Sequence, residues 1–155
     1  MAVSDSRCNE TEIRALLFHA ERMVLWQSVE AWDDNSLSCS TSTHNDVKNP
    51  LRRDGALSSI HLAEYGAQMM AIHGALLVRK NTGGTLAPGV LTSLKDFEMH
   101  VPRIDDISAV LTGTAKVLIS GASGSIYEFS IDAGDRRVAS GRVSVLTLPG
   151  ATTST

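Results

Sequence analysis

Residues 58–84 read SSIHLAEYGAQMMAIHGALLVRKNTGG, and this stretch decides the fold. Ser58 or Ser59 can cap the start of a helix that runs to about Arg79, where Arg79-Lys80 suits the negative end of its dipole. The run that follows, with its two glycines, ends the helix. At about 1.5 Å per residue such a helix is roughly 30 Å long. Because it is apolar on nearly every side, other structure must wrap most of it.

The sequence after this helix predicts the elements that do the wrapping. Strand-like runs alternate there with turn sequences that contain proline or glycine. They favour four strands, over Leu91–His100, Ile107–Ser120, Ser125–Ile131 and Arg137–Leu148. Small residues such as Gly113 and Ala115 lie on one face of the second strand, where they would let a helix approach closely.

Three further elements precede the helix. Asn9, followed three residues later by Glu12, has the pattern of a capping box, which predicts a short helix over about 10–18. Met23–Trp32 is rich in β-forming residues and Ser36–Thr43 alternates polar and apolar side chains, so the pair predicts a hairpin. The predicted order is therefore a short helix, two strands, one long helix and four strands.

Length and composition are those of a folded single domain. The 155 residues fit one domain over 1–155, with the tail from about 150 to 155 expected to be disordered. Hydrophobic residues make up 43% and charged residues 20%, which excludes a disordered chain. The net charge is −3, so no global positive field attracts nucleic acid.

We expect neither a membrane span nor a metal site. The apolar run of membrane length, 60–78, is interrupted by charged and polar side chains that are costly in lipid. The start of the chain lacks the apolar core of an export signal, so we expect a cytoplasmic protein. Cys8 and Cys39 lack the spacing of a zinc site or a disulfide framework, and no three His or carboxylate residues have metal spacing.

A polar stripe crosses the apolar central helix. His61, Glu64 and Gln68 fall on one face at helical spacing. Burying the Glu64 carboxylate there without partners costs several kcal/mol, so a buried Glu64 requires a reason. Two interpretations remain open: a structural hydrogen bond or an exposed helix end, and a catalytic acid.

Three segments resemble the motifs of one enzyme family. Leu16–Leu25 (LLFHAERMVL) resembles the L-x-P-H-x-x-P-x-L-L opening of hotdog 3-hydroxyacyl-acyl-carrier-protein dehydratases. His44, with Asn49-Pro50 and Gly55, resembles their H-F-P-G-H-P…P-G loop, and Glu64–Gln68 (EYGAQ) resembles their E-A-M-A-Q helix start. The sequence from Asn49 to Gly55 is most similar to the divergent branch found in aryl-polyene gene clusters.

The resemblance implies a fold, a reaction and a set of roles. The fold is α+β, with an antiparallel sheet wrapped around one long helix, and the reaction converts a 3-hydroxyacyl thioester to its trans-2-enoyl product. His44 is then the base and Glu64 the acid, supplied by opposite subunits of a homodimer, with Gln68 in support. Free N–H groups near the helix start would form the oxyanion site, between Gly55 and Ser59 and including Ser58.

The implied partner is an acyl carrier protein, which is acidic and presents its substrate on a phosphopantetheine arm. No other cofactor is implied. Three basic pairs are candidates for docking it: Arg52-Arg53, Arg79-Lys80 and Arg136-Arg137.

Two alternatives remain. Asn49 stands where the family usually has a second histidine, and the run from His44 to Glu64 is longer than usual. These departures leave open a catalytically silent paralogue that binds carrier protein or pairs with an active dehydratase. A hotdog thioesterase, whose helix carboxylate directs water at the thioester carbonyl, is the other alternative. Structural roles are expected for the remaining histidines: His19, His61, His73 and His100.

Overall fold

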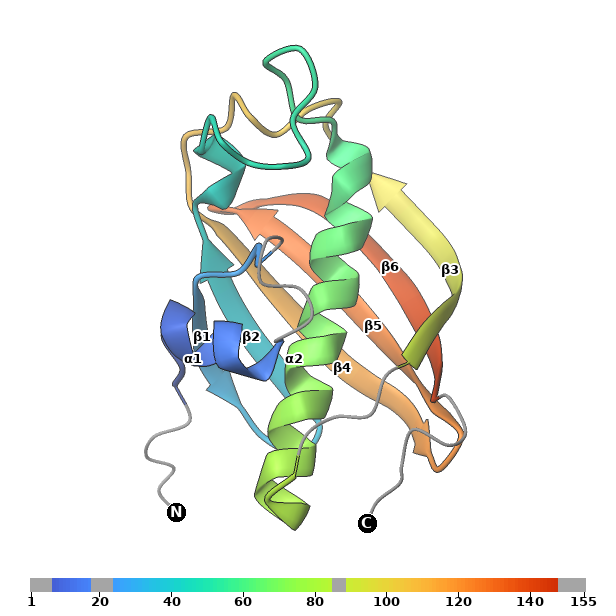
Figure 1. Cartoon of the computed structure of the whole chain (residues 1–155). Helices are drawn as coiled ribbons and strands as arrows, with labels where there is room; N and C mark the ends of the chain where they lie inside the picture. Colours follow the sequence, from blue (N-terminus) through green and yellow to red (C-terminus); the bar gives the residue numbers. More distant parts are fainter. Residues whose placement is uncertain (1–6, 18–23, 85–88, 148–155) are drawn as a thin grey trace.

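Six antiparallel strands curve around one long helix in the computed structural model, which describes residues 7–17, 24–84 and 89–147 (Figure 1). The helices are α1 (Glu10–Leu16) and α2 (Leu62–Thr82), with two short 3-10 turns, η2 (Thr43–Asn45) and η3 (Ser59–His61). The strands are β1 (Ser28–Trp32), β2 (Ser36–Thr41), β3 (Gly89–Met99), β4 (Leu111–Gly121), β5 (Gly124–Ala133) and β6 (Arg136–Thr147).

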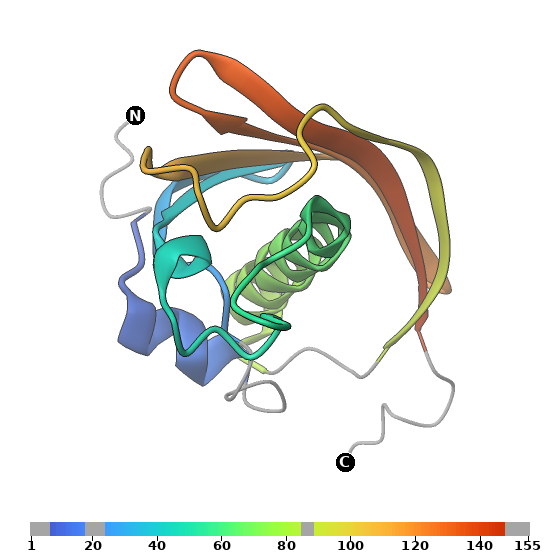
Figure 2. The same ribbon diagram turned by 90° about the horizontal axis from the view of Figure 1, so that it is seen from above.

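The strands form a single sheet in the order β1-β2-β4-β5-β6-β3, and every neighbouring pair is antiparallel. Figure 2 shows the sheet curling around α2, while α1 packs against α2 and β1. Strands β1 and β3 are the two edges. This arrangement confirms the predicted α+β class and the hotdog architecture that the resemblance implied.

The starts of both helical segments and the end of α2 are capped as the sequence indicates. The Asn9 side chain accepts from the Glu12 N–H at 2.9 Å, and the Glu12 side chain accepts from the Asn9 N–H at 2.9 Å. At the start of the long helical segment, Ser58 Oγ accepts from the Ile60 N–H at 3.2 Å. Gly83, with φ of 74° in the left-handed region, ends α2. The capping-box helix and the serine cap are thus confirmed.

Close packing of α2 on the sheet depends on glycine. A Cβ placed on Gly113 of β4 would lie 2.6 Å from the Trp26 ring and 2.7 Å from Met69 Sδ. A Cβ on Gly66 of α2 would lie 2.6 Å from the Phe129 ring. The expected close approach of the helix to the second long strand is therefore confirmed, and it needs glycine on both sides.

The predicted hairpin is present as β1 and β2, although β1 begins at Ser28 rather than near Met23. The late start of a second strand bears on the site. β4 starts at Leu111 rather than near Ile107, because the carbonyls of Ile107 and Ala109 face His44 instead of a neighbouring strand. Residues 18–23, which include His19 of the first family-like motif, and the tail from 148 lie outside the described residues. Across the described ranges, no helix is both long enough and apolar enough to cross a membrane.

Candidate active site

His44 occupies a short turn directly after β2 and is fully buried. Its Nε2 lies 3.0 Å from the carbonyl oxygen of Ile107 and 3.1 Å from that of Ala109. Because carbonyl oxygens only accept, we assign the ring hydrogen to Nε2, which donates to both. The other ring nitrogen, Nδ1, is the buried side-chain atom without a hydrogen-bond partner within the described residues. The imidazole therefore presents a basic lone pair on Nδ1.

The surroundings of this ring keep it neutral. Burial lowers the pKa of His44, and the nearby positive charge of Arg52 lowers it further, while the hydrogen bonds to Ile107 and Ala109 act in the opposite direction. A neutral imidazole with one unoccupied nitrogen is the form that a general base requires.

Side chains to which the sequence analysis assigned no supporting role hold the main chain before His44. The Tyr65 hydroxyl lies 3.1 Å from Thr43 Oγ1, and Asn49 Nδ2 donates to the Tyr65 hydroxyl at 3.2 Å and to the Thr43 carbonyl at 3.0 Å. Thr43 Oγ1 in turn donates to the Leu25 carbonyl at 2.6 Å. Asn49, which replaces the usual histidine, thus ties the His44 turn to the central helix. The sequence held one signal of this network, the tyrosine next to Glu64 in an apolar helix. A buried tyrosine hydroxyl needs hydrogen-bond partners.

A second set of contacts holds the segment whose Ile107 and Ala109 carbonyls bind His44. Asp105 accepts from the Leu57 N–H at 2.8 Å and pairs with Arg103, and these contacts hold the pKa of the Asp105 carboxyl well below its usual range. Asn45 Nδ2 donates to the Ile107 carbonyl at 2.7 Å. The chain before α2 is therefore tied to the segment before β4 that faces His44.

Glu64 lies in the first turn of α2, and its environment differs from the buried carboxylate that a catalytic acid implied. Its side chain is 47% exposed, and Oε1 lies 2.7 Å from His61 Nδ1. The single chain therefore matches the exposed, hydrogen-bonded interpretation of the polar stripe. No described contact joins Glu64 to His44 within this chain.

The side-chain carbonyl oxygen of Gln68 binds the main chain before β1. Oε1 accepts from the Leu25 N–H at 2.7 Å and from the Trp26 N–H at 3.3 Å. These two hydrogen bonds position the chain that enters β1.

Of the five residues from Gly55 to Ser59, where the oxyanion site was expected, three use their N–H groups in hydrogen bonds within the chain. The Ala56 N–H donates to the Arg53 carbonyl, and the Ser59 N–H donates to the Pro102 carbonyl at 3.2 Å. The Leu57 N–H donates to Asp105. Gly55 and Ser58 are exposed residues, and their N–H groups are the ones in this stretch that enter no hydrogen bond of the described residues.

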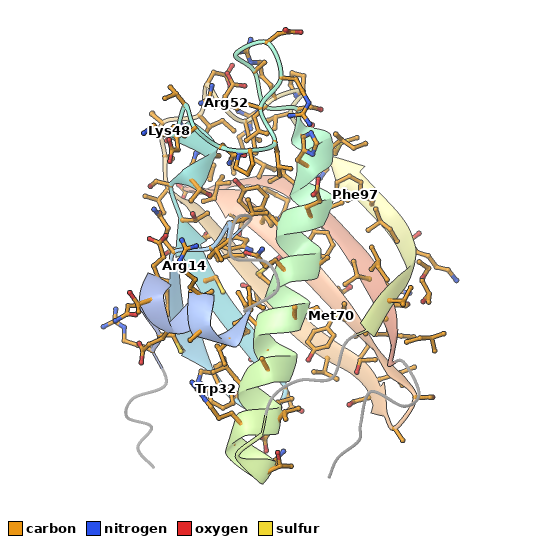
Figure 3. The ribbon with its side chains drawn as sticks, in the orientation of Figure 1. Arg14, Trp32, Lys48, Arg52, Met70 and Phe97 are labelled. Carbon is orange, nitrogen blue, oxygen red and sulfur yellow. The ribbon has the colours of Figure 1, made fainter. Side chains whose placement is uncertain are left out.

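The three basic pairs do not gather at one place. Arg52 and Lys48 lie at the end of the molecule where α2 begins, whereas Trp32, over which Lys80 lies at 5.9 Å, is at the other end (Figure 3). Lys80 also pairs with Asp34 at 2.7 Å, and Arg137 pairs with Asp132 at 2.5 Å. The Arg79-Lys80 pair, in the last turn of α2, is therefore remote from His44.

Two cavities border the site. One, of about 440 Å³, is lined by Arg103 and Arg136 and by the Ile107–Ala109 segment whose carbonyls bond His44. The other, of about 590 Å³, lies between the start of the central helix and the end of β3, with Ser58, Ile60 and Met99 in its wall. Arg136 thus lies at the His44 end of the molecule, unlike Lys80.

One family model matches most of the chain. The model of the ApeP-like family, described as ApeP dehydratase, matches residues 11–154. No curated protein matches the sequence. Among solved structures, the dehydratase heterocomplex ApeI:P from Xenorhabdus doucetiae is similar with a TM-score of 0.77 at 22% identity, covering 88% of this chain and 90% of that chain.

Two more distant structures have the same fold. AziG from S. sahachiroi has a TM-score of 0.60 at 20% identity, with 84% of this chain and 95% of that chain covered. Thioesterase superfamily member 2 from Mus musculus has a TM-score of 0.62 at 14% identity, with 88% and 92% covered. At these identities the structural likenesses establish the fold alone, and the family match carries the assignment.

Proposed function

Because the chain belongs to the ApeP-like dehydratase family, we propose that it removes water from a 3-hydroxyacyl thioester, with His44 as the base and Glu64 as the acid. The observation that carries the proposal is the buried, neutral imidazole of His44, whose Nδ1 has no partner within the described residues. Aryl-polyene biosynthesis is the setting that the family indicates. Of the two hotdog enzyme classes, the family match favours the dehydratase over the thioesterase.

The chemistry assigns one proton transfer to each residue. His44 Nδ1 takes the proton from C2, and the electron pair of that C–H bond forms the C2–C3 double bond through the thioester enolate. The C3 hydroxyl leaves as water with a proton from Glu64, so the elimination leaves an imidazolium and a carboxylate. His44 then releases its proton to solvent and Glu64 takes one up, which restores the starting state. The N–H groups of Gly55 and Ser58 are the donors proposed for the enolate oxygen.

A second subunit completes this site in the proposal. In the single chain His44 is sealed inside and the Glu64 side chain is 47% exposed, so each residue lacks its counterpart. β3 is an edge strand, and four large apolar side chains on it are 39–51% exposed: Val90, Leu91, Leu94 and Met99. Pairing two such edges would bury these side chains and bring another protomer beside the Met99 cavity.

We take that protomer to be another hotdog subunit, either a second copy of this chain or a related dehydratase chain. The similarity to a protein that forms a dehydratase heterocomplex supports testing both arrangements. The acyl group is delivered by an acyl carrier protein on its phosphopantetheine arm. Arg136, in the wall of the cavity beside Ile107, is the cation we propose for docking this acidic partner.

The test is a direct assay of the reaction. The purified chain, alone and mixed with a related hotdog dehydratase subunit, is incubated with 3-hydroxyacyl-carrier protein, and loss of one water is followed by mass spectrometry. Glu64→Gln, which keeps the shape of the side chain, and His44→Asn, which removes the imidazole, should each abolish the loss. Water loss that persists in both variants, or its absence in every mixture, would refute the proposal.

The same assay separates the alternatives. Free acid in place of the enoyl product identifies a thioesterase. Carrier binding without turnover by the chain alone, together with activity in a mixture where only the other subunit's residues are needed, identifies a silent partner. In that case His44→Asn in this chain would leave the activity of the mixture unchanged.

A further inference from the structure

The side chain of Arg52 lies across the loop that follows His44. Its Nε donates to the Asp46 carbonyl at 2.9 Å, Nη1 to the Gly55 carbonyl at 3.0 Å, and Nη2 to the His44 carbonyl at 3.3 Å. All three nitrogens of the guanidinium are therefore used on the main chain. Figure 3 shows Arg52 in this loop, above the first turn of α2.

The three carbonyls belong to the two ends of one loop. Two of them lie at its start, on His44 and Asp46, and the third lies after a turn in which Asp54 and Gly55 have φ of 54° and 78°. A planar guanidinium presents its donors in a fixed fork, so one side chain can bind all three acceptors at once. A lysine ammonium is a compact donor on a flexible stem and cannot reproduce this geometry.

These contacts complete the support of the base. The ring of His44 is held at Nε2 by Ile107 and Ala109, and the residue before it is held by Asn49. The Arg52 contacts fix the main chain of His44 itself and of the residues after it. Without Arg52, the carbonyl of His44 would lose its side-chain donor. The main chain after His44 could then move, and the orientation of the imidazole ring would no longer be fixed.

We propose that Arg52 is a positioning residue that holds the His44 turn in its reactive geometry, and that it is not a docking site for carrier protein. The inference rests on the proposed function, because it concerns the base of that reaction. Docking would require the guanidinium to face a partner's carboxylates or phosphate, whereas its donors face carbonyls of its own loop.

The chain offers a matched control in Lys48. It carries the same charge, lies in the same loop and is exposed (Figure 3), and its ammonium enters no hydrogen bond within the described ranges. Arg52→Lys retains the charge and removes the planar set of guanidinium donors, whereas Arg52→Ala removes both. Lys48→Ala removes a charge from the same loop and leaves those donors in place.

The first experiment measures kcat and KM for 3-hydroxyacyl-carrier protein at low and high salt. Arg52→Lys and Arg52→Ala should lower kcat by about 10-fold to 100-fold, the size expected for a misplaced catalytic group, with little change in KM. Guanidinium ion added to Arg52→Ala should restore part of kcat, while Lys48→Ala should keep the wild-type kcat. An increase in KM that depends on salt, with kcat unchanged, would assign Arg52 to docking and overturn the inference.

A second experiment does not depend on activity. In the wild-type protein the Nε2–H of His44, bonded to two carbonyls, should give a slowly exchanging imidazole proton signal in NMR, assigned by its loss in His44→Asn. Arg52→Ala should make this proton exchange faster, with the melting temperature recorded to detect unfolding, and Lys48→Ala should leave it unchanged. An unaltered signal in folded Arg52→Ala refutes the positioning role, whereas absence of dehydration with the expected NMR result refutes only the proposed function.

Discussion

His73 Nδ1, near the middle of α2, lies 2.5 Å from the Tyr127 hydroxyl on β5. The other ring nitrogen, Nε2, lies 2.7 Å from the Asp33 carbonyl, so it is the donor and Nδ1 accepts from Tyr127. Both residues are buried, and burial raises the pKa of Tyr127 to about 12. This pair joins the helix to the sheet far from the proposed catalytic residues, which agrees with the structural role expected for His73.

Replacing Tyr127 with phenylalanine should destabilise the protein without affecting its chemistry. Tyr127→Phe keeps the ring but leaves His73 Nδ1 buried without a donor, which costs about 1–3 kcal/mol. Urea unfolding of the wild type and the variant measures the difference. A loss of dehydration by the folded variant would contradict this separation of the core from the site.

Stability should fall as the pH drops below about 6.5, the ordinary pKa of histidine. Burial lowers the pKa of both His44 and His73, so the unfolded chain takes up protons in this range before the folded chain does. Each group therefore contributes stability that is complete at neutral pH and decreases on acidification, by at most about 1.4 kcal/mol per pH unit. The free energy of unfolding, measured between about pH 8 and pH 5, tests the sign. His73→Gln should reduce the slope, and a stability that increases on acidification would be the opposite result.

Gly113 should tolerate no larger residue. In Gly113→Ala the new Cβ would lie 2.6 Å from the Trp26 ring, so the helix and the sheet must move apart, at a cost of about 1–3 kcal/mol. Gly121→Ala is the matched control, because a Cβ there meets nothing within 4 Å. Thermal melting of the two variants gives the comparison, and equal melting temperatures would show that the close approach is unimportant.

A charge on the edge strand should separate the subunits while leaving the fold intact. Leu94 on β3 is 39% exposed, and Leu94→Lys would place an ammonium in the proposed interface. Leu118→Lys on β4, where leucine is 45% exposed, introduces the same change away from that edge. Light scattering of the protein and of its mixture with a related subunit should show dissociation, with loss of dehydration, for Leu94→Lys alone. An assembly that survives this substitution would place the interface elsewhere.

The resemblance to a known family pointed to His44 as the proposed base, and the sequence did not show which side chains support it. His44 was chosen because His44, Asn49-Pro50 and Gly55 resemble, in their order along the chain, the loop of the hotdog dehydratase family. That Asn49 binds Tyr65, and that Arg52 grips carbonyls of its own loop, depends on how the loop folds back. Arg52 was one member of three basic pairs that were candidates for docking a carrier protein, and the structure places its guanidinium against the main chain of its own loop.

The sequence was enough to predict the order of the elements, the helix caps and the glycine packing. These features depend on residue types at short spacing and on the periodicity of apolar residues. The tertiary structure decided which nitrogen of His44 is available, since that follows from two carbonyls more than sixty residues away. It also decided that Glu64 is exposed in the single chain and bonded to His61. How much of α2 the sheet covers depends on where each strand lies. Local pattern determines which elements form, and burial and hydrogen bonding between distant segments determine what their side chains face.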